Sequence, residues 1–385
     1  MLLSRLVAKN AFRHKLRTGL TIVGIVVAIT AFGLLRTIVD AWYAGANASS
    51  SARLITRSSV SLVFSLPLTY AQKIRQVPGV RSVSWANWFG GVYVSERNFF
   101  PQFAIDAASY LDMYPEFVLA PAERKAFLTD RKGAVVGRKL ADQFGWKIGD
   151  VIPLRGTIYT GTWNFTLRGI YDGANKGVDQ STFFFHWDLL NETIKKLYPR
   201  RGDQTGVFIV QLNDPAEAAE VSAAIDAMFR NSLAETLTET EKAFQLSFVA
   251  MTETILLAIQ AVSFVVIVII MAVMANTMAM TSRERRSEYA TLKALGFSGS
   301  FVARLILAES IGIALVGGLA AIALTIPLAA AFAERVGTLF PIFFVSRPTM
   351  LAQAGAALCV GVVAAALPAW RTARVRIADG LRAVG

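Results

Sequence analysis

Four long apolar stretches constrain this chain more than any other feature of its sequence. Each has roughly the 20 residues that a helix needs to cross a bilayer core of about 30 Å. They lie at approximately 19–39, 254–280, 305–333 and 350–369. A segment of about 200 residues with ordinary polarity separates the first two stretches, and the other connections are short. The sequence therefore predicts one membrane-spanning helix, a large domain, and three further spans.

The charged residues indicate how these spans are oriented. A net charge of +12 would suggest nucleic-acid binding in a soluble chain, but 54% hydrophobic and 17% charged residues exclude a wholly soluble protein. Residues 1–18, 281–300 and 371–385 carry net charges of +5, +2 and +3, whereas residues 40–247 carry +1. The positive-inside rule places both termini and the 281–300 loop in the cytoplasm and the large domain outside. The basic surplus is therefore a topology signal, and we expect no nucleic-acid partner.

The N-terminal residues 1–18 mix apolar and basic side chains, a pattern typical of a helix lying on the inner membrane surface. A frayed basic tail is the alternative. We expect the first apolar stretch to be retained as a span rather than cleaved as a signal peptide, because its apolar core is long enough to cross the bilayer. The one cysteine, Cys359, excludes an intrachain disulfide and a CxxC motif.

The segment between the first two spans has the pattern of an α+β domain. Val60–Phe64, Val80–Trp85 and Val207–Leu212 predict strands, and amphipathic stretches between such runs predict helices. The middle of the segment repeats strand and helix patterns of its own, which suggests an insertion. We expect a split subdomain at 45–107 and 204–234, an inserted subdomain at 108–203, and a stalk at 235–247.

The domain offers little that would support catalysis. The chain has two histidines, His14 in the basic N-terminal segment and His186 beside Trp187, and no GxSxG motif accompanies them. Its acidic residues are scattered singly, without the spacing of metal ligands. We expect no catalytic residue, metal site or cofactor in this chain, and we interpret the domain as mechanical or binding.

Aromatic residues crowd two stretches of the domain. Core packing would explain most of them, but an apolar ligand cleft or a partner surface stays open as an alternative, because exposure decides between the two. The candidates for such a surface are Trp85, Trp88, Phe89, Phe183, Phe184 and Trp187.

The loop at 281–300 contains a short amphipathic helical pattern. Arg285, Arg286 and Glu288 precede its apolar periodicity, and Gly296 follows it at the position of a C-cap glycine. Such a helix would lie along the membrane and offer a contact to a cytoplasmic partner. A solvated charged loop is the alternative.

Charged residues within the spans are few. Arg304 and Glu309 lie about one turn apart at the cytoplasmic edge of the third stretch, and Glu253 lies at the outer edge of the second. We expect these side chains to pair or to reach the interface. No ionisable group lies near the midplane, where a proton relay would need one.

Three segments resemble the MacB/FtsX-like family of ABC-transporter permeases. They are the pattern from Lys9 to Ile25, the run from Arg285 to Gly296 with the glycines of the third span, and the ending from Pro368 to Arg382. No single motif is specific to the family, but the order and spacing of these segments cover essentially the whole chain. The large insertion after the first span fits the same pattern.

The resemblance implies a multi-pass permease of the bacterial inner (cytoplasmic) membrane with four transmembrane helices and an extracytoplasmic α+β domain. It implies a homodimer, or a pair with a related permease subunit, and a separate cytoplasmic ATPase that binds ATP and Mg. A GxxxxGK(S/T) motif is absent from this chain. A periplasmic adaptor stays open as a further partner. The residues implied in ATPase contact are Arg285, Arg286, Glu288, Leu292, Lys293, Ala294, Leu295 and Gly296. For Arg285 and Arg286, anchoring of lipid phosphate headgroups is the alternative.

The implied function is to relay ATP-driven motion through long stalk helices to the outer domain, for export or extraction of an apolar or amphipathic substrate. The chain itself would then be no enzyme. A non-transporting regulator of a cell-wall hydrolase or of a signalling partner is the alternative. An enzyme on a membrane anchor is disfavoured, because an anchor would not need three further spans.

Overall fold

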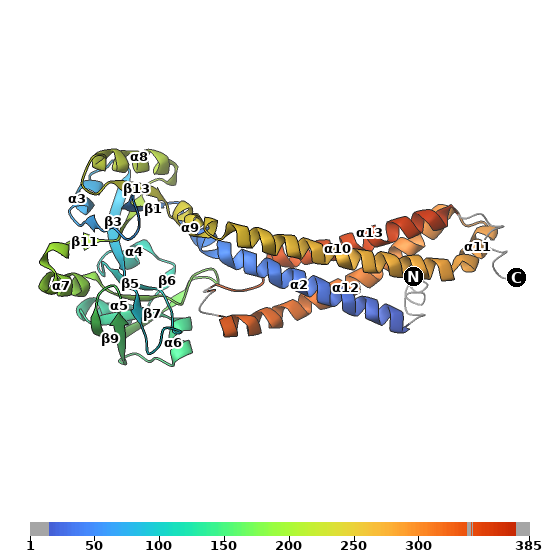
Figure 1. Ribbon diagram of the computed structural model, residues 1–385, viewed down its shortest axis with the longest axis horizontal. Coiled ribbons are helices and arrows are strands. Elements are labelled where there is room, and N and C mark those ends of the chain that lie inside the picture. The colour runs from blue at the N-terminus through green and yellow to red at the C-terminus, as the bar shows by residue number, and fades with distance from the viewer. Residues whose placement is uncertain (1–14, 337–339, 341, 375–385) are drawn as a thin grey trace. The chain divides into compact units, whose positions relative to one another are not determined.

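The computed structural model describes residues 15–336, 340 and 342–374 (Figure 1). These residues divide into two compact units. One unit holds the chain up to Ala41, residues 252–335, and the chain from Phe343 onward; the other holds residues 42–251 and 336–342. Most of the predicted N-terminal amphipathic segment, including His14, and the tail after Arg374 lie outside the described residues.

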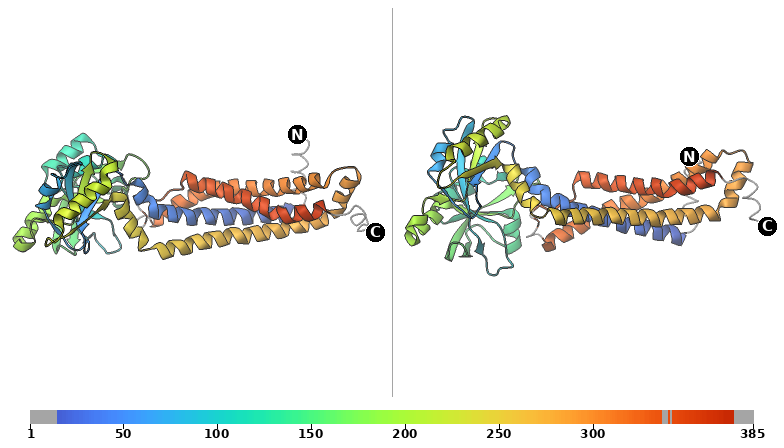
Figure 2. Two further views of the ribbon diagram at one scale, coloured as in Figure 1. Left: turned by 90° about the horizontal axis from the view of Figure 1, so that it is seen from above. Right: turned by 45° about the horizontal axis from the view of Figure 1, so that its top comes forward.

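Four long helices form the first unit and confirm the four predicted spans. They are α2 (Lys15–Ala48), α10 (Glu253–Glu284), α12 (Gly299–Val336) and α13 (Arg347–Ala373). All four are long and apolar enough to cross a membrane. They run alongside one another in both views of Figure 2. The last residues of α2 belong to the second unit.

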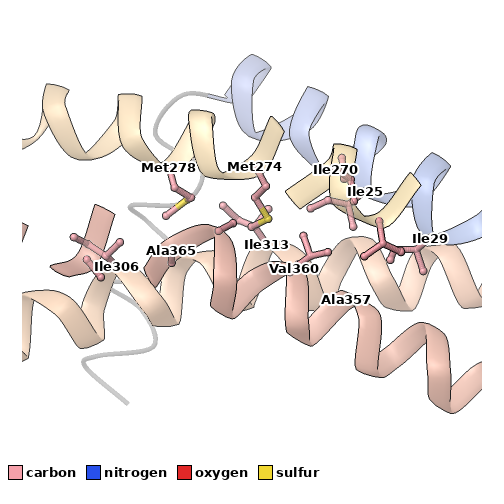
Figure 3. Packing of buried hydrophobic residues seen from close by; sticks show 14 of the residues in the cluster. Ile25, Ile29, Ile270, Met274, Met278, Ile306, Ile313, Ala357, Val360 and Ala365 are labelled. Carbon is pink, nitrogen blue, oxygen red and sulfur yellow. The ribbon is translucent and has the colours of Figure 1, made fainter. Parts of the chain in front are cut away.

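The bundle packs through apolar and small side chains. Ile25 of α2, Met274 of α10 and Val360 of α13 lie in one buried cluster (Figure 3). A Cβ added at Gly318 of α12 would lie 2.5 Å from the Cβ of Ala357, so these two helices approach closely only because residue 318 is glycine. Helices in lipid associate through such close packing, because no hydrophobic effect drives them together there.

The second unit is an α+β domain built on one mixed sheet. Its eleven strands follow the order β13-β1-β12-β3-β5-β10-β7-β9-β8-β4, with β6 paired to β9, and a small second sheet joins β11 to β2. The pairs β5/β10 and β7/β9 are parallel and the others antiparallel. The strands are β1 (Arg53–Ser58), β2 (Leu66–Pro67), β3 (Val80–Trp88), β4 (Gly91–Val92), β5 (Gln102–Ile105), β6 (Phe117–Val118), β7 (Gly133–Gly137), β8 (Val151–Gly156), β9 (Gly161–Gly173), β10 (Phe183–His186), β11 (Gln204–Thr205), β12 (Val207–Leu212) and β13 (Thr236–Thr240).

Helices lie between these strands along the chain. Those of the domain are α3 (Tyr70–Ile74), α4 (Tyr110–Met113), α5 (Pro121–Thr129), α6 (Arg138–Phe144), α7 (Trp187–Leu197), α8 (Ala218–Phe229) and α9 (Glu241–Ala250). The sheet continues without interruption from the residues of the expected split subdomain to those of the expected insertion, so the division into two subdomains stays a prediction.

Two local predictions in the domain need correction. The expected strand at Val60–Phe64 is a loop, and the strand β1 ends at Ser58. Val63 is 86% exposed, so the apolar residues of this run do not form a buried strand. Within the expected stalk at 235–247, residues Thr236–Thr240 form the edge strand β13 rather than a helix, because they pair with β1 along its full length.

Arg53, at the start of β1, is buried among polar partners. Its Nε donates to Glu241 Oε2 at 2.8 Å, its Nη2 to Glu116 Oε1 at 2.5 Å, and its Nη1 to the carbonyl of Met113 at 2.9 Å. Burial by itself lowers the pKa of Arg53, but its hydrogen bond to Glu116 and the charge of Glu241 outweigh burial and raise this pKa above its ordinary value. Arg53 thus ties the chain that follows α2 to α9, which precedes α10.

Replacing Arg53 with Met should destabilise the domain by about 3–5 kcal/mol, because Glu241 and Glu116 then lose their buried partner. Urea unfolding of the full chain in detergent, followed by tryptophan fluorescence, measures this change. Arg124→Ala is the control, since it removes an exposed pair with Asp112 that is expected to contribute about 1 kcal/mol or less. Equal losses in the two variants would contradict the assignment.

Candidate functional site

The loop between α10 and α12 contains the helix α11 (Arg286–Ala294), where the sequence predicts a contact helix. Gly296 has a φ of 93°, its N–H donates to the carbonyl of Lys293 at 3.0 Å, and the N–H of Phe297 donates to the carbonyl of Leu292 at 3.1 Å. These two bonds form a Schellman motif, which needs a left-handed residue that glycine supplies without strain. The predicted C-cap is therefore confirmed.

Arg285, immediately before α11, faces the protein interior. Its Nη1 donates to Glu309 Oε2 at 2.9 Å and its Nε to Glu288 Oε2 at 3.0 Å. The guanidinium also lies 5.2 Å from the ring centre of Tyr289. The side chains of Arg285 and Glu309 are only 7% and 4% exposed. Arg285 therefore fixes α11 to α12, and its predicted contact with an ATPase stays a prediction.

The charge state of this cluster is set by its neighbours. Burial disfavours the charged form of Arg285, but the Tyr289 ring and the carboxylates of Glu288 and Glu309 outweigh burial, so the pKa of Arg285 lies above its ordinary value. Burial raises the pKa of Tyr289 to about 12. Both groups therefore keep their protons at neutral pH, and Arg285 acts as a permanent clamp rather than as a switch.

Lys293 is engaged with its own chain. Its Nζ donates to the carbonyl oxygens of Ala373 at 2.6 Å and Thr372 at 3.4 Å, at the last turn of α13. An ammonium group at a helix C-terminus interacts favourably with the helix dipole. The hydroxyls of Ser282 and Thr372 are 2.8 Å apart and tie α10 to the same turn. Lys293 thus holds α11 on the bundle.

The exposed part of the predicted contact set is smaller and partly apolar. Arg286 and residues 294–297 are exposed, with Leu295 72% and Phe297 44% accessible. Glu288 is 40% exposed while it binds Arg285, and Leu292 packs against the bundle cluster. We name residues 294–297 the exposed cap. It is the exposed apolar surface at the C-terminal end of α11.

The six aromatic residues considered for a partner surface do not form one. Phe89 and Phe183 are 0% exposed, Phe184 is 2% and Trp187 is 4% exposed, so these four fill the domain core. Their rings pack on other core aromatics; Phe89 and Phe183, for example, both lie in the cluster around Phe165. Trp85 is partly buried, and Trp88 alone is exposed, at 39%. For the four buried rings, core packing is the correct interpretation.

His186 has the environment of a packed histidine. Its Nε2 lies 2.7 Å from the carbonyl oxygen of Phe127, and its ring packs 4.4 Å from that of Phe127. Burial lowers the pKa of His186, which favours the neutral ring. Across the described ranges, no group of three or more His, Cys, Asp or Glu side chains could hold a metal ion.

The arrangement defines a class of protein: a multi-pass membrane protein with an α+β domain between its first two spans and a clamped loop helix before its third. Two family models match it. The MacB-like periplasmic core domain matches residues 18–228, and the FtsX-like permease C-terminal matches residues 261–377. The chain belongs to the MacB/FtsX-like family of ABC-transporter permeases, and its α+β domain is the extracytoplasmic domain of that family.

Individual known proteins are more distant. The uncharacterized ABC transporter permease protein Rv0987 of Mycobacterium tuberculosis is 25% identical over 199 residues, which are 51% of this chain and 22% of that protein. The extracellular domain of the ABC-type transporter YknZ from Gram-positive bacteria aligns with 49% of this chain and 100% of its own at 11% identity and a TM-score of 0.36. The periplasmic region of MacB from Actinobacillus actinomycetemcomitans aligns with 52% and 94% at 9% identity and a TM-score of 0.37.

The sequence does not identify the partner of Glu309. Arg304 lies about one turn away, but it is exposed, and its Nε donates to the carbonyl of Ser300 at 3.3 Å. The sequence does indicate that Glu309 has a partner, because a carboxylate in an apolar span needs a buried partner. Arg285, in the preceding loop, is the cation that meets this need.

Replacing Glu309 with Leu should release α11 from α12, because the charge of Arg285 then stays buried without its main partner. Removing one member of a buried pair costs about 3–5 kcal/mol, so amide hydrogen exchange across Arg286–Ala294 should accelerate by about a hundredfold or more. Arg304→Ala is the control and should leave exchange in α11 unchanged. Unchanged exchange in Glu309→Leu would refute the clamp.

Proposed function

We propose that this protein is the permease subunit of an ABC transporter and that the exposed cap of α11 docks on a cytoplasmic ABC ATPase. The observation that carries the proposal is the contrast between the residues that flank the two ends of one short helix. Its base is clamped by the buried Arg285–Glu309 pair at 2.9 Å, whereas Leu295 at the other end is 72% exposed. An apolar anchor on a rigid support is what the centre of a binding interface requires.

ATP and Mg belong to the partner ATPase in this proposal. The 385 residues contain no GxxxxGK(S/T) motif, so the phosphate-binding loop has to come from outside them. We assign no catalytic role to this chain. The burial of His186 supports this view, because its ring is 6% exposed and already bonded to a backbone carbonyl.

The function of the chain is then to relay motion of the ATPase to the extracytoplasmic domain. The continuity of α2 supports this relay, because one helix of 34 residues includes both bundle residues and residues of the second unit. A helix satisfies its backbone hydrogen bonds internally and therefore moves as a stiff element. A second copy of the chain, or a related permease subunit, would complete the transporter.

The proposed substrate is apolar or amphipathic and is exported or extracted on the outer side. The loop that follows β1 supports this class, because it presents Val60, Val63 and Phe64 at 77%, 86% and 57% exposure. Neighbouring exposed apolar side chains of this kind mark interaction sites on soluble surfaces. A periplasmic adaptor is a further partner that this loop would suit.

We place the chain in the bacterial inner membrane with both termini and α11 in the cytoplasm. The charge distribution supports this orientation, because the segments 1–18, 281–300 and 371–385 together hold ten of the twelve net positive charges. Basic loops are retained on the cytoplasmic side of the membrane. The same orientation puts α11 where an ATPase is found.

Replacing Leu295 with Glu should abolish capture of the ATPase, because a charge replaces the apolar anchor of the interface. We expect an ATP-binding subunit to co-purify with the tagged chain from membranes of its own host, and its yield to fall at least about tenfold in Leu295→Glu. Val63→Glu is the matched control on another exposed apolar residue and should retain the ATPase. If the unmodified chain brings down no ATP-binding protein, the proposed function is wrong.

A further inference from the structure

The helix α13 is held at both of its ends by other elements of the bundle. At its C-terminal end, Lys293 of α11 binds the carbonyl of Ala373 at 2.6 Å. The start of α12 is pressed against the same turn, since a Cβ added at Gly299 would lie 2.6 Å from the carbonyl oxygen of Ala373. The end of α13 is therefore bound to α11 and lies against the start of α12.

At the other end of α13, the partner is α2. Asp40 Oδ2 accepts hydrogen bonds from the hydroxyls of Ser346 at 2.8 Å and Thr349 at 2.5 Å. Ser346 is also the N-cap of α13, where its Oγ accepts from the N–H of Thr349 at 3.2 Å. Thr349 is fully buried. A carboxylate at a helix N-terminus is favoured by the helix dipole, so Asp40 and the first turn of α13 form a strong joint.

A third joint connects the same two helices about one turn further along α13. The Nε2 of Gln353 donates to the carbonyl of Ile29 at 3.0 Å and to Thr325 Oγ1 at 2.8 Å. A Cβ added at Gly33 of α2 would lie 2.1 Å from this nitrogen, so the joint depends on glycine at that position. Gln353 is 0% exposed, and its Oε1 has no donor among the described residues. Burying an amide oxygen without a donor costs free energy, which indicates that Gln353 has a role beyond filling space.

We propose that α13 is a strut that carries displacement of α11 to the outer half of α2, with Lys293, Gln353 and Asp40 as its positioning residues. The 27 residues of α13 span about 40 Å at 1.5 Å per residue, enough to join the two ends of the bundle. The strut rests on the proposed function, because it matters only if an ATPase displaces α11. Helices α2 and α10 offer routes for displacement because each is covalently continuous with the extracytoplasmic domain. The strut adds a further route through the fourth span.

The test uses the full chain with its captured ATPase in lipid nanodiscs. It measures the change in the rate of ATP hydrolysis that the permease causes, divided by the amount of captured ATPase, and this change is the measure of coupling. Thr349→Val and Gln353→Leu remove a joint without adding volume. Each should leave ATPase capture unchanged and reduce this change at least about fivefold. Thr349→Ser keeps the hydroxyl and should behave as the unmodified chain. Full coupling in both Thr349→Val and Gln353→Leu would overturn the strut and leave the proposed function intact.

A double-mutant comparison addresses transmission along the helix itself. Lys293→Met removes a contact at the C-terminal end of α13, and Thr349→Val removes one at its N-terminal end. The two sites are too far apart to affect each other directly. If α13 acts as one strut, the double variant should retain as much coupling to ATP hydrolysis as the single variant that retains less of it. Multiplicative losses would show two independent effects and would overturn the proposal.

A covalent bridge covers the case in which the removal variants fail to fold. Asp40→Cys with Thr349→Cys, in a chain that carries Cys359→Ser, can be joined by a short bis-methanethiosulfonate reagent. The strut requires coupling to be present in the bridged form and lost after reduction. Coupling that is absent in the bridged form, or that survives reduction, would overturn it. Absence of any captured ATPase would instead refute the proposed function.

Discussion

The bilayer core offers no water, so the backbone polar groups of the four long helices have to find their partners in the protein. Lipid also removes the hydrophobic effect as a force between helices, which leaves close packing and hydrogen bonds to hold the bundle. Helix α13 uses both. A Cβ at Gly361 would lie 2.9 Å from Ala314, and Gln353 bonds to the backbone of Ile29. The position of α13 therefore depends on a few specific contacts, and these contacts couple it to its neighbours.

Two buried arginines use the same arrangement in different parts of the molecule. Arg53 follows the end of α2 and Arg285 follows the end of α10, and each lies between two carboxylates from distant or neighbouring chain segments. These carboxylates are Glu116 and Glu241 for Arg53, and Glu288 and Glu309 for Arg285. Buried pairs add little net stability, but breaking one is costly, so each pair disfavours arrangements that leave one of its charges buried without a partner. Both fix the chain directly after a long helix.

The features predicted correctly from the sequence are those that short stretches determine. Span length, charge asymmetry and the strand Val207–Leu212 depend on composition and periodicity within one segment. Exposure does not, which is why Val60–Phe64 is an open loop and Phe183 lies in the core although both runs are apolar. The burial of Arg285 was not predicted for the same reason, because it depends on how α12 brings Glu309 against the loop. The glycine cap at Gly296 was predicted correctly, because a Schellman motif is a local structure.

The joints of the bundle differ in strength, and this difference decides where it can yield. Arg285 and Glu309 are buried, so solvent screens their attraction little. Arg17 of α2 and Glu284 of α10 also pair, at 2.7 Å, but their side chains are 29% and 38% exposed. Exposed pairs contribute little, because water and salt compete for both charges. The loop helix α11 is therefore held by firm joints to α12 and α13, whereas the exposed pair between the start of α2 and the end of α10 is a weak joint, and apolar packing does most to hold those two helices together.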